Sequence, residues 1–118
     1  MFLIIRIKFS PDAEEVYNYL NKEAPNSKTE RMIFDAFSKK IELMKENPHY
    51  GNPIKKELIP QEYKKTYGVS NLFRVELPAA WRMLYTLTNG ESEIEIIAFV
   101  LDIMDHRKYD KKFGYRKM

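Results

Sequence analysis

The sequence of 118 residues has no cysteine and only two histidines, His49 and His106. Without cysteine, the chain cannot form a disulfide bond, a thiol nucleophile or a thiolate zinc site. Two histidines are also too few for a multi-histidine metal centre, so we expect neither a metal nor another cofactor. Because small secreted domains often depend on disulfides, the composition favours a cytoplasmic protein.

A long hydrophobic run is also missing. The apolar start, residues 1–6, is far too short to cross a membrane, because a spanning helix needs about 20 apolar residues. It also lacks the order of a signal peptide, in which basic residues precede an apolar run and then small residues. We therefore expect no membrane contact, and we interpret this segment as part of a strand.

The sequence does contain enough apolar material for one core. Hydrophobic residues make up 44% of the chain and aromatic residues 14%, and aromatic side chains bury the most surface per residue. The length fits one domain, since domains commonly have about 100–150 residues. No repeat or low-complexity tract divides the chain, so we predict a single domain over residues 1–118.

The net charge is +3, and much of the positive charge gathers in two segments. The first segment holds Lys55, Lys56, Lys64 and Lys65, and the second holds Arg107, Lys108, Lys111, Lys112, Arg116 and Lys117. Clustered lysine and arginine indicate a polyanionic partner such as a nucleic acid. The alternative is a solvated surface that only keeps the protein soluble.

The first half of the chain predicts a strand followed by two helices. Apolar and basic residues alternate over residues 5–9, which is the pattern of a half-buried strand. Ser10-Pro11 is typical of a helix start, and Pro25 ends that helix. Residues 27–30 form a capping box that opens a second helix, which closes at Asn47-Pro48. A short joint between the two helices indicates a helical hairpin.

The second half predicts a long connection and then three strands. Residues 47–71 are irregular apart from a short turn near residues 61–65, and long loops in compact domains are often functional. Strands with alternating apolar residues are predicted at residues 73–77, 81–87 and 94–100. The predicted fold is α+β: an N-terminal strand, a two-helix hairpin and a three-stranded antiparallel meander, with the helices packed on one sheet face.

The alternation also predicts which residues of the first two meander strands face each other. A turn at residues 78–80 places Glu76 opposite Arg82 on the outer face of the sheet, with Arg74 on the same face. Arg82 then has two interpretations. It forms a stabilising cross-strand ion pair with Glu76, or it is a guanidinium held on rigid strands to bind a phosphate.

A turn at Asn89-Gly90 predicts the register of the last two strands. It sets Arg82 near Ile97, and it leaves the outer face fairly apolar, with Ile97, Phe99 and Leu101. A partner helix, the C-terminal tail or a second copy of the chain is expected to cover these residues. The free protein is accordingly expected to be a monomer or a dimer.

The segment after the last strand combines three kinds of polar group within four residues. His106 carries an imidazole, Arg107 a guanidinium and Tyr109 a phenol. Polar and basic residues at the end of a strand often serve solubility alone. The alternative is a compact set of groups for proton transfer and phosphate binding.

These motifs, taken in order, resemble the toxins of the RelE/ParE superfamily of type II toxin–antitoxin systems. Residues 72–77, followed by Trp81-Arg82-Met83-Leu84-Tyr85, resemble the paired central strands of the family, where a basic residue precedes a Tyr-Arg-hydrophobic-hydrophobic-Tyr motif. His106-Arg107, with tyrosines beyond, resembles the family's last strand. Residues 48–58 match the usual connection after the second helix. The resemblance spans the whole chain in element order.

The resemblance implies a ribosome-dependent mRNA endonuclease that works without a metal and is held inactive by an antitoxin. In such an enzyme the ribose 2′-hydroxyl attacks the adjacent phosphate, a base removes its proton, and an acid protonates the leaving oxygen. Arginines stabilise the charge that develops on the phosphate. By position, the resemblance assigns this last role to Arg74, Arg82 and Arg107, and proton donation to His106 or Tyr109.

The resemblance also implies roles for residues outside this central group. Tyr115 is an alternative to Tyr109, and the RNA backbone is expected to contact Lys55, Lys56, Lys64 and Lys65. Glu76 is a departure, because the best-known RNA-cutting members carry a lysine there. Its carboxylate either acts as the base or neutralises Arg82.

Two other functions fit the same fold. A ParE-like member inhibits DNA gyrase by binding it and cuts nothing. A catalytically degenerate homologue keeps only RNA or protein binding, with the Glu76–Arg82 pair closing the old site. In the leading interpretation the partners are a cognate antitoxin protein and ribosome-bound mRNA.

Overall fold

The computed structural model describes residues 4–90, 92 and 95–114, so Tyr115, Arg116 and Lys117 lie outside the described residues. The elements follow in the order β1 (Ile4–Phe9), α1 (Pro11–Glu23), α2 (Lys28–Glu46), β2 (Asn52–Pro53), η1 (Lys56–Leu58), α3 (Gln61–Tyr67), β3 (Phe73–Glu76), η2 (Pro78–Ala80), β4 (Arg82–Asn89), β5 (Glu95–Met104) and α4 (His106–Phe113). The predicted strand, helical hairpin and antiparallel meander are confirmed. The structure adds the short strand β2, two helices and two 3-10 turns.

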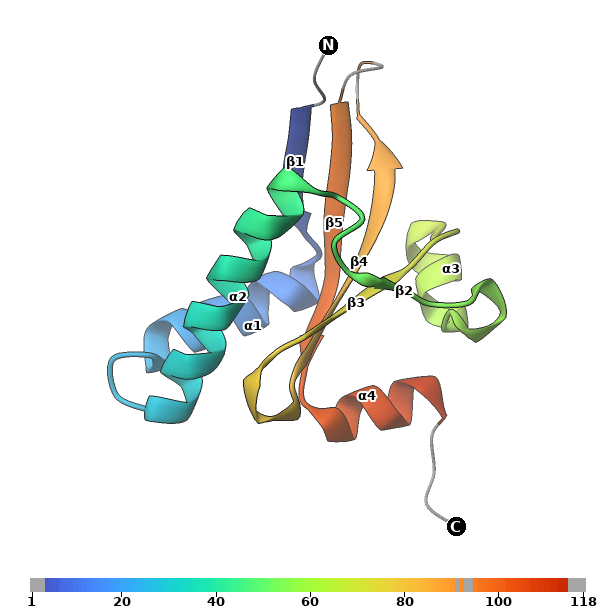
Figure 1. Ribbon diagram of the computed structural model, residues 1–118. Coiled ribbons are helices and arrows are strands. Elements are labelled where there is room, and N and C mark those ends of the chain that lie inside the picture. The colour runs from blue at the N-terminus through green and yellow to red at the C-terminus, as the bar shows by residue number, and fades with distance from the viewer. Residues whose placement is uncertain (1–3, 91, 93–94, 115–118) are drawn as a thin grey trace.

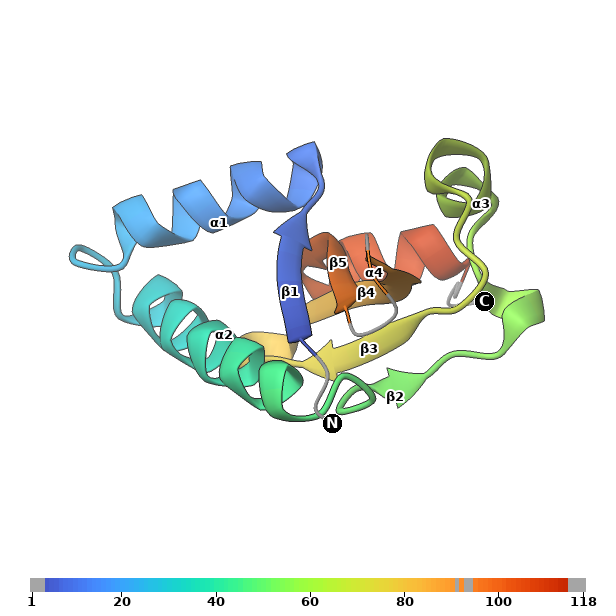
Figure 2. The same cartoon turned by 90° about the horizontal axis from the view of Figure 1, so that it is seen from above.

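Within the described part of the chain, five strands form one mixed sheet in the order β1-β5-β4-β3-β2 (Figure 1). β1 lies parallel to β5, and the other neighbouring strands are antiparallel. α1 and α2 cover one face, which we call the inner face, whereas α3 and α4 lie on the opposite, outer face (Figure 2). The expectation that helices cover one face therefore describes α1 and α2 but omits the outer helices.

The two hairpin helices begin where the sequence predicts. The Oγ of Ser10 accepts a hydrogen bond from the Ala13 backbone N–H at 3.0 Å, which caps α1. At the start of α2, Ser27 accepts a hydrogen bond from the Glu30 N–H and donates one to the Glu30 carboxylate. No helix among the described residues has the length and apolar character needed to cross a membrane.

The inner core joins the hairpin to the sheet. α2 contributes Ile33, Phe37 and Met44, whose exposed fractions are 2% or less. The strands contribute Phe73, Val75, Met83, Tyr85, Ala98, Val100 and Ile103. Burying each large apolar side chain stabilises the fold by about 1.5–3 kcal/mol, so this face holds the scaffold rigid.

A second core lies on the outer face beneath α3 and α4. Its buried residues are Ile59, Tyr63, Val69, Leu72, Leu84, Leu101, Met104 and Tyr109. Leu101 is only 1% exposed, and the Phe99 ring packs edge-on against the Tyr67 ring at 5.2 Å. The apolar outer face is thus covered largely by the chain itself, through α3 and the C-terminal segment.

α3 and α4 replace a predicted short turn and a predicted strand end. Both segments are rich in polar residues, so they lack the apolar periodicity that predicts a helix. α4 buries only the side that carries Tyr109 and Phe113. Its two ends nevertheless carry recognisable signals. The Asp105 carboxylate accepts a hydrogen bond from the Lys108 N–H at 2.9 Å, and Gly114 ends the helix with a φ of 74°.

The register of the meander is predicted correctly at the first turn and wrongly at the second. Glu76 lies opposite Arg82, as expected. Arg82 lies opposite Met104, however, and not near Ile97. The connection between β4 and β5 is longer than the predicted two-residue turn, since Asn89 itself pairs with Ile96. The corrected register moves Arg82 to the end of β5, beside the start of α4.

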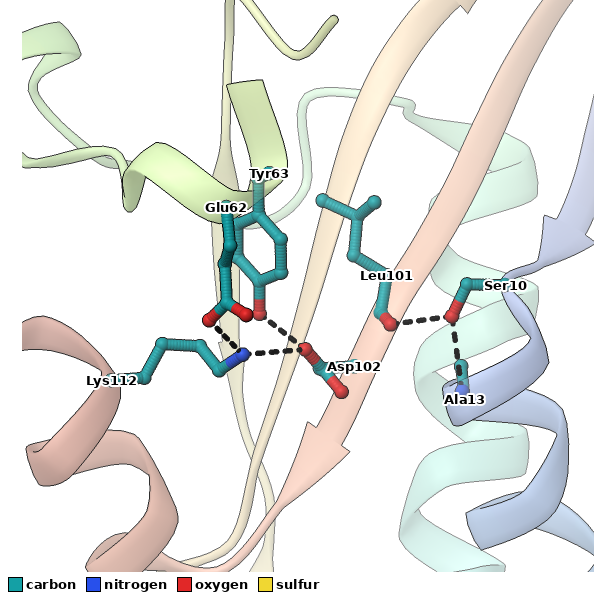
Figure 3. A network of polar contacts seen from close by, with 7 residues as sticks. All are labelled: Ser10, Ala13, Glu62, Tyr63, Leu101, Asp102 and Lys112. Atoms are coloured by element: carbon teal, nitrogen blue, oxygen red, sulfur yellow. Dashed lines mark hydrogen bonds and ion pairs between the residues drawn. The ribbon is translucent and has the colours of Figure 1, made fainter. Parts of the chain in front are cut away.

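A β-bulge in β5 contributes to the same shift. Consecutive residues of β4 pair with Asp102 and then with Val100, so Leu101 is the extra residue. The Leu101 carbonyl accepts a hydrogen bond from the buried Ser10 hydroxyl at 2.6 Å (Figure 3). The bulge leaves Leu101 in the outer core and directs the neighbouring Asp102 toward α3.

Candidate functional site

Two arginines from neighbouring strands meet over one tyrosine ring on the outer face. The guanidinium carbon of Arg82 lies 4.6 Å from the centre of the Tyr109 ring, and that of Arg74 lies 5.9 Å from it. The Nη1 of Arg74 donates a hydrogen bond to the Tyr109 hydroxyl at 3.0 Å. A cation over an aromatic face gains about 0.5–2 kcal/mol, so the ring helps to hold both side chains.

The carboxylate of Glu76 lies between the same two arginines. Its Oε1 is 3.0 Å from the Nε of Arg74, and its Oε2 is 3.6 Å from the Nε of Arg82. The expected Glu76–Arg82 pair is present, but the carboxylate is shared. The Glu76 side chain is 53% exposed, against 33% for Arg74 and 22% for Arg82. Two positive charges and one negative charge leave the cluster with a net positive charge that solvent can reach.

The η2 turn holds one edge of the Arg82 guanidinium. The carbonyl of Ala80 accepts a hydrogen bond from Arg82 Nη1 at 2.8 Å. Ala79 and Ala80 have φ values of 59° and 61°, in the left-handed region where a Cβ costs roughly 1–2 kcal/mol. The chain therefore maintains a strained turn at the point where it presents an arginine.

Tyr109 reaches the cluster from α4 and is 2% exposed. Its ring stacks on Phe113, with the ring centres 4.5 Å apart. Because the ring is covered by the guanidinium groups on one side and by the outer core on the other, Tyr109 is a support for the arginines. A direct role as proton donor to a bound ligand would need an exposed hydroxyl.

His106 and Arg107 are both exposed in the first turn of α4, instead of ending a strand. Residues advance by about 100° around an α-helix, so Arg107 is directed about 200° away from Tyr109. His106 precedes Tyr109 by three residues and shares its side of the helix. The structure thus brings together Arg74, Arg82, Glu76 and Tyr109. His106 lies on the Tyr109 side of α4, and Arg107 lies on the other side.

Of the four predicted RNA-binding lysines, Lys55 lies nearest to the cluster. A pocket of about 200 Å³ is lined by Pro53, Ile54, Lys55, Leu58, Arg74 and Tyr109. Lys56, Lys64 and Lys65 are exposed on η1 and α3, outside this pocket. Among these lysines, only Lys55 is therefore placed to share a ligand with Arg74.

A second pocket next to Arg74 contains two residues that the sequence did not single out. Its volume is about 270 Å³, and it is lined by Lys40, Tyr50, Gly51, Asn52, Arg74, Val75 and Glu76. The Nζ of Lys40 donates a hydrogen bond to the Tyr50 hydroxyl at 3.0 Å. No local pattern marks Lys40 or Tyr50, because only the packing of α2 against the sheet brings them to Arg74.

Tyr85 ties the loop after α2 to the sheet and so positions the second pocket. Its hydroxyl donates a hydrogen bond to the Pro48 carbonyl at 2.7 Å and accepts one from the Gly51 N–H at 2.9 Å. Burial raises the pKa of Tyr85, although the hydrogen bond from Gly51 acts in the opposite direction. A Cβ on Gly51 would lie 3.0 Å from the Phe73 Cβ, so this close approach requires glycine.

No protein-family model matches the chain, and no curated protein matches it. Among solved structures, a YoeB/ParE toxin from Agrobacterium tumefaciens is similar, with a TM-score of 0.58 and 14% sequence identity. The match covers 86% of this chain and 98% of that toxin. At this identity the likeness concerns the fold, and it confirms the α+β arrangement that the sequence motifs predict.

Proposed function

We propose that the protein is the toxin of a toxin–antitoxin pair and that it cleaves ribosome-bound mRNA. The observation that supports this most strongly is the cluster of Arg74, Arg82 and Glu76 over the buried Tyr109 ring. A guanidinium pair on rigid strands is suited to a phosphate, because each group offers several N–H donors in a fixed plane. The fold shared with a YoeB/ParE toxin supports the same assignment.

In the proposed reaction, the ribose 2′-hydroxyl attacks the adjacent phosphorus and the bond to the 5′-oxygen breaks. Glu76, the most exposed group of the cluster, takes the proton of the hydroxyl. Arg74 and Arg82 stabilise the negative charge that develops on the phosphate oxygens. The products are a 2′,3′-cyclic phosphate and a 5′-hydroxyl.

The leaving 5′-oxygen needs a proton donor at the margin of the cluster. His106 fits this role better than Tyr109, because His106 is exposed and Tyr109 is buried. Arg107 is not assigned to the transition state, since it faces away from the Tyr109 side of α4. Lys55 extends the positive surface along the RNA, and Lys56, Lys64 and Lys65 provide more distant backbone contacts.

The partners follow from the same proposal. A toxin of this kind acts in the cytoplasm, where ribosomes hold its mRNA substrate. A cognate antitoxin protein, expressed with the toxin, keeps it inactive by covering the positive surface around the cluster.

Expression of Arg82→Ala in cells without an antitoxin tests the proposal. The wild-type protein is expected to slow growth and to leave mRNAs cut on ribosomes. Arg82→Ala should reduce cleavage by about 10²–10³-fold, because it removes a donor to the developing charge. Primer extension on total RNA measures the cut sites, and circular dichroism of the purified variant checks that it is folded.

The control is Arg31→Ala, which removes an exposed arginine on α2 and should leave cleavage unchanged. Full toxicity of a folded Arg82→Ala protein would contradict the proposed site. Intact mRNA together with loss of DNA supercoiling would identify a gyrase inhibitor instead. Intact mRNA with unaffected growth would leave a binding module.

A further inference from the structure

Asp102 lies outside the arginine cluster, in the bulged part of β5 between α3 and α4 (Figure 3). The hydroxyl of Tyr63 on α3 donates a hydrogen bond to Asp102 Oδ2 at 2.5 Å. The Nζ of Lys112 on α4 lies 3.5 Å from the same oxygen. The Asp102 side chain is 14% exposed. One carboxylate oxygen therefore joins both outer helices to the sheet.

Lys112 is held by more than this contact. Its ammonium pairs with the Glu62 carboxylate of α3 and lies 4.8 Å from the centre of the Tyr63 ring. Only 18% of the Lys112 side chain is exposed. A side chain enclosed in this way is restricted to few conformations, so the position of its ammonium restricts the position of α4.

Lys112 and Tyr109 lie three residues apart on α4, which places them on adjacent positions of one side of the helix. α4 has eight residues, and its apolar anchors on the outer core are Tyr109 and Phe113. The contacts of Lys112 with Asp102 and Glu62 add a polar anchor to these two ring contacts. A shift that separates Lys112 from Asp102 would also move the Tyr109 ring under the guanidinium groups.

Burial raises the pKa of Asp102, whereas the Tyr63 hydrogen bond and the Lys112 charge act in the opposite direction. The ionised carboxylate therefore destabilises the folded protein slightly, because desolvation outweighs its attractive contacts. The contacts of Asp102 with Tyr63 and Lys112 join three elements. They specify where the helices sit.

We propose that Asp102 is a positioning residue for the candidate active site. By holding Lys112 it fixes α4, and α4 then keeps Tyr109 beneath the two arginines. The effect of Asp102 on RNA cleavage rests on the proposed function. Its effect on α4 rests only on the contacts described above. The positioning role and the proposed function can therefore be tested separately.

The test compares Asp102→Asn, Lys112→Met and Lys111→Met in the full-length protein. Asparagine keeps an oxygen acceptor for Tyr63, removes the charge and replaces the second oxygen with an NH₂ group. Lys111 is exposed on the same helix, which makes Lys111→Met the matched control. We expect amide hydrogen exchange in α4 to become about tenfold faster in Asp102→Asn and Lys112→Met, and to stay unchanged in the control.

A second measurement follows Tyr109 itself. In protein labelled with ¹³C at tyrosine Cζ, the Tyr109 resonance should move in Asp102→Asn and Lys112→Met, while the Tyr85 resonance of the inner core stays in place. With RNA as substrate, kcat should fall about tenfold while KM stays unchanged, because the reacting groups are misplaced but the surface still binds. In a folded Tyr109→Leu background, Asp102→Asn should cause no further loss.

Unchanged α4 exchange and an unchanged Tyr109 resonance in Asp102→Asn would overturn the proposal, whatever the RNA assay shows. Faster α4 exchange in Asp102→Asn and Lys112→Met, together with a wild-type protein that cuts no RNA, would support the positioning role and reject the proposed function. A fall in kcat that persists unchanged in the Tyr109→Leu background would also overturn the proposal, because Asp102 would then act by another route.

Discussion

At the scale of single residues, the behaviour of the cluster depends on Glu76. Its carboxylate lies 3.0 Å from the Nε of Arg74 and 3.6 Å from the Nε of Arg82. An exposed carboxylate beside two guanidinium groups is placed to accept the proton of a hydroxyl nucleophile. The same carboxylate also cancels one positive charge that a phosphate would otherwise meet. The two roles predict opposite effects of its removal.

Glu76→Gln separates these roles, because it keeps the shape of the side chain and removes its charge. If Glu76 is the base, the single-turnover rate of RNA cleavage should fall by about 10²–10⁴-fold. RNA affinity, measured by fluorescence anisotropy, should stay equal or become tighter. Glu57→Gln on η1 removes an exposed carboxylate and serves as the control. Faster cleavage by Glu76→Gln would show that the carboxylate only neutralises the arginines.

At the scale of elements, the bulge in β5 adjusts the strand beside the site. It shifts the residue opposite Arg82 by one, to Met104, and directs Asp102 to the outer face. Ser10 supports the bulge from the inner side, since its hydroxyl donates to the Leu101 carbonyl at 2.6 Å while it caps α1. One buried serine thus links the start of the hairpin to β5, the strand that carries Asp102 and leads into α4.

Ser10→Ala should lower the free energy of unfolding by about 2 kcal/mol, because it removes a helix cap and leaves a buried carbonyl without its donor. Urea denaturation followed by circular dichroism measures the change. Ser38→Ala is the control, since the Ser38 hydroxyl is exposed and bonds only within α2. Equal stability losses in the two variants would show that the link between Ser10 and Leu101 contributes nothing.

The elements also show how far the sequence predicts this molecule. The helix caps and the alternation of β3 and β4 are local, so the hairpin and the Glu76–Arg82 pairing could be predicted. The bulge has no local signature, because the carbonyl that it releases is satisfied by a serine about 90 residues away. The connection before β5 is longer than the predicted two-residue turn and the bulge adds one residue, so the sequence wrongly predicts Arg82 near Ile97 and a strand end in place of α4. The sequence places Tyr109 close to the basic residues along the chain, but it does not show that the ring is buried beneath Arg74 and Arg82.

At the scale of the whole molecule, the sheet carries a core on each face, and the two cores have different tasks. The inner core binds the hairpin to the strands with apolar contacts. The outer core also contains the polar network of Asp102, Tyr63 and Lys112, which connects to Tyr109 through α4. The inner side thus joins the hairpin to the sheet, whereas the outer side adds the groups that shape the site.

This division predicts a pH effect on stability. Burial raises the pKa of Asp102 above its usual value of 3.8, so the ionised group is destabilising at neutral pH. As the pH falls through the folded pKa toward 3.8, the carboxyl takes up a proton and this cost is lost. The free energy of unfolding of the wild type, relative to that of Asp102→Asn, should therefore rise between pH 7 and pH 4. Urea denaturation of both proteins measures the difference, and a fall would contradict the prediction.

The most direct test of the central claim uses purified protein, programmed ribosomes and two mRNAs that differ in a single atom. Once the cut site is mapped, one mRNA carries a 2′-deoxynucleotide immediately 5′ of the scissile phosphate. The wild-type protein should cut the unmodified mRNA to a 2′,3′-cyclic phosphate and a 5′-hydroxyl, and it should leave the modified mRNA intact at that position. Cleavage of the modified mRNA at an unchanged rate would contradict attack by the 2′-hydroxyl and with it the assigned chemistry of the arginine cluster.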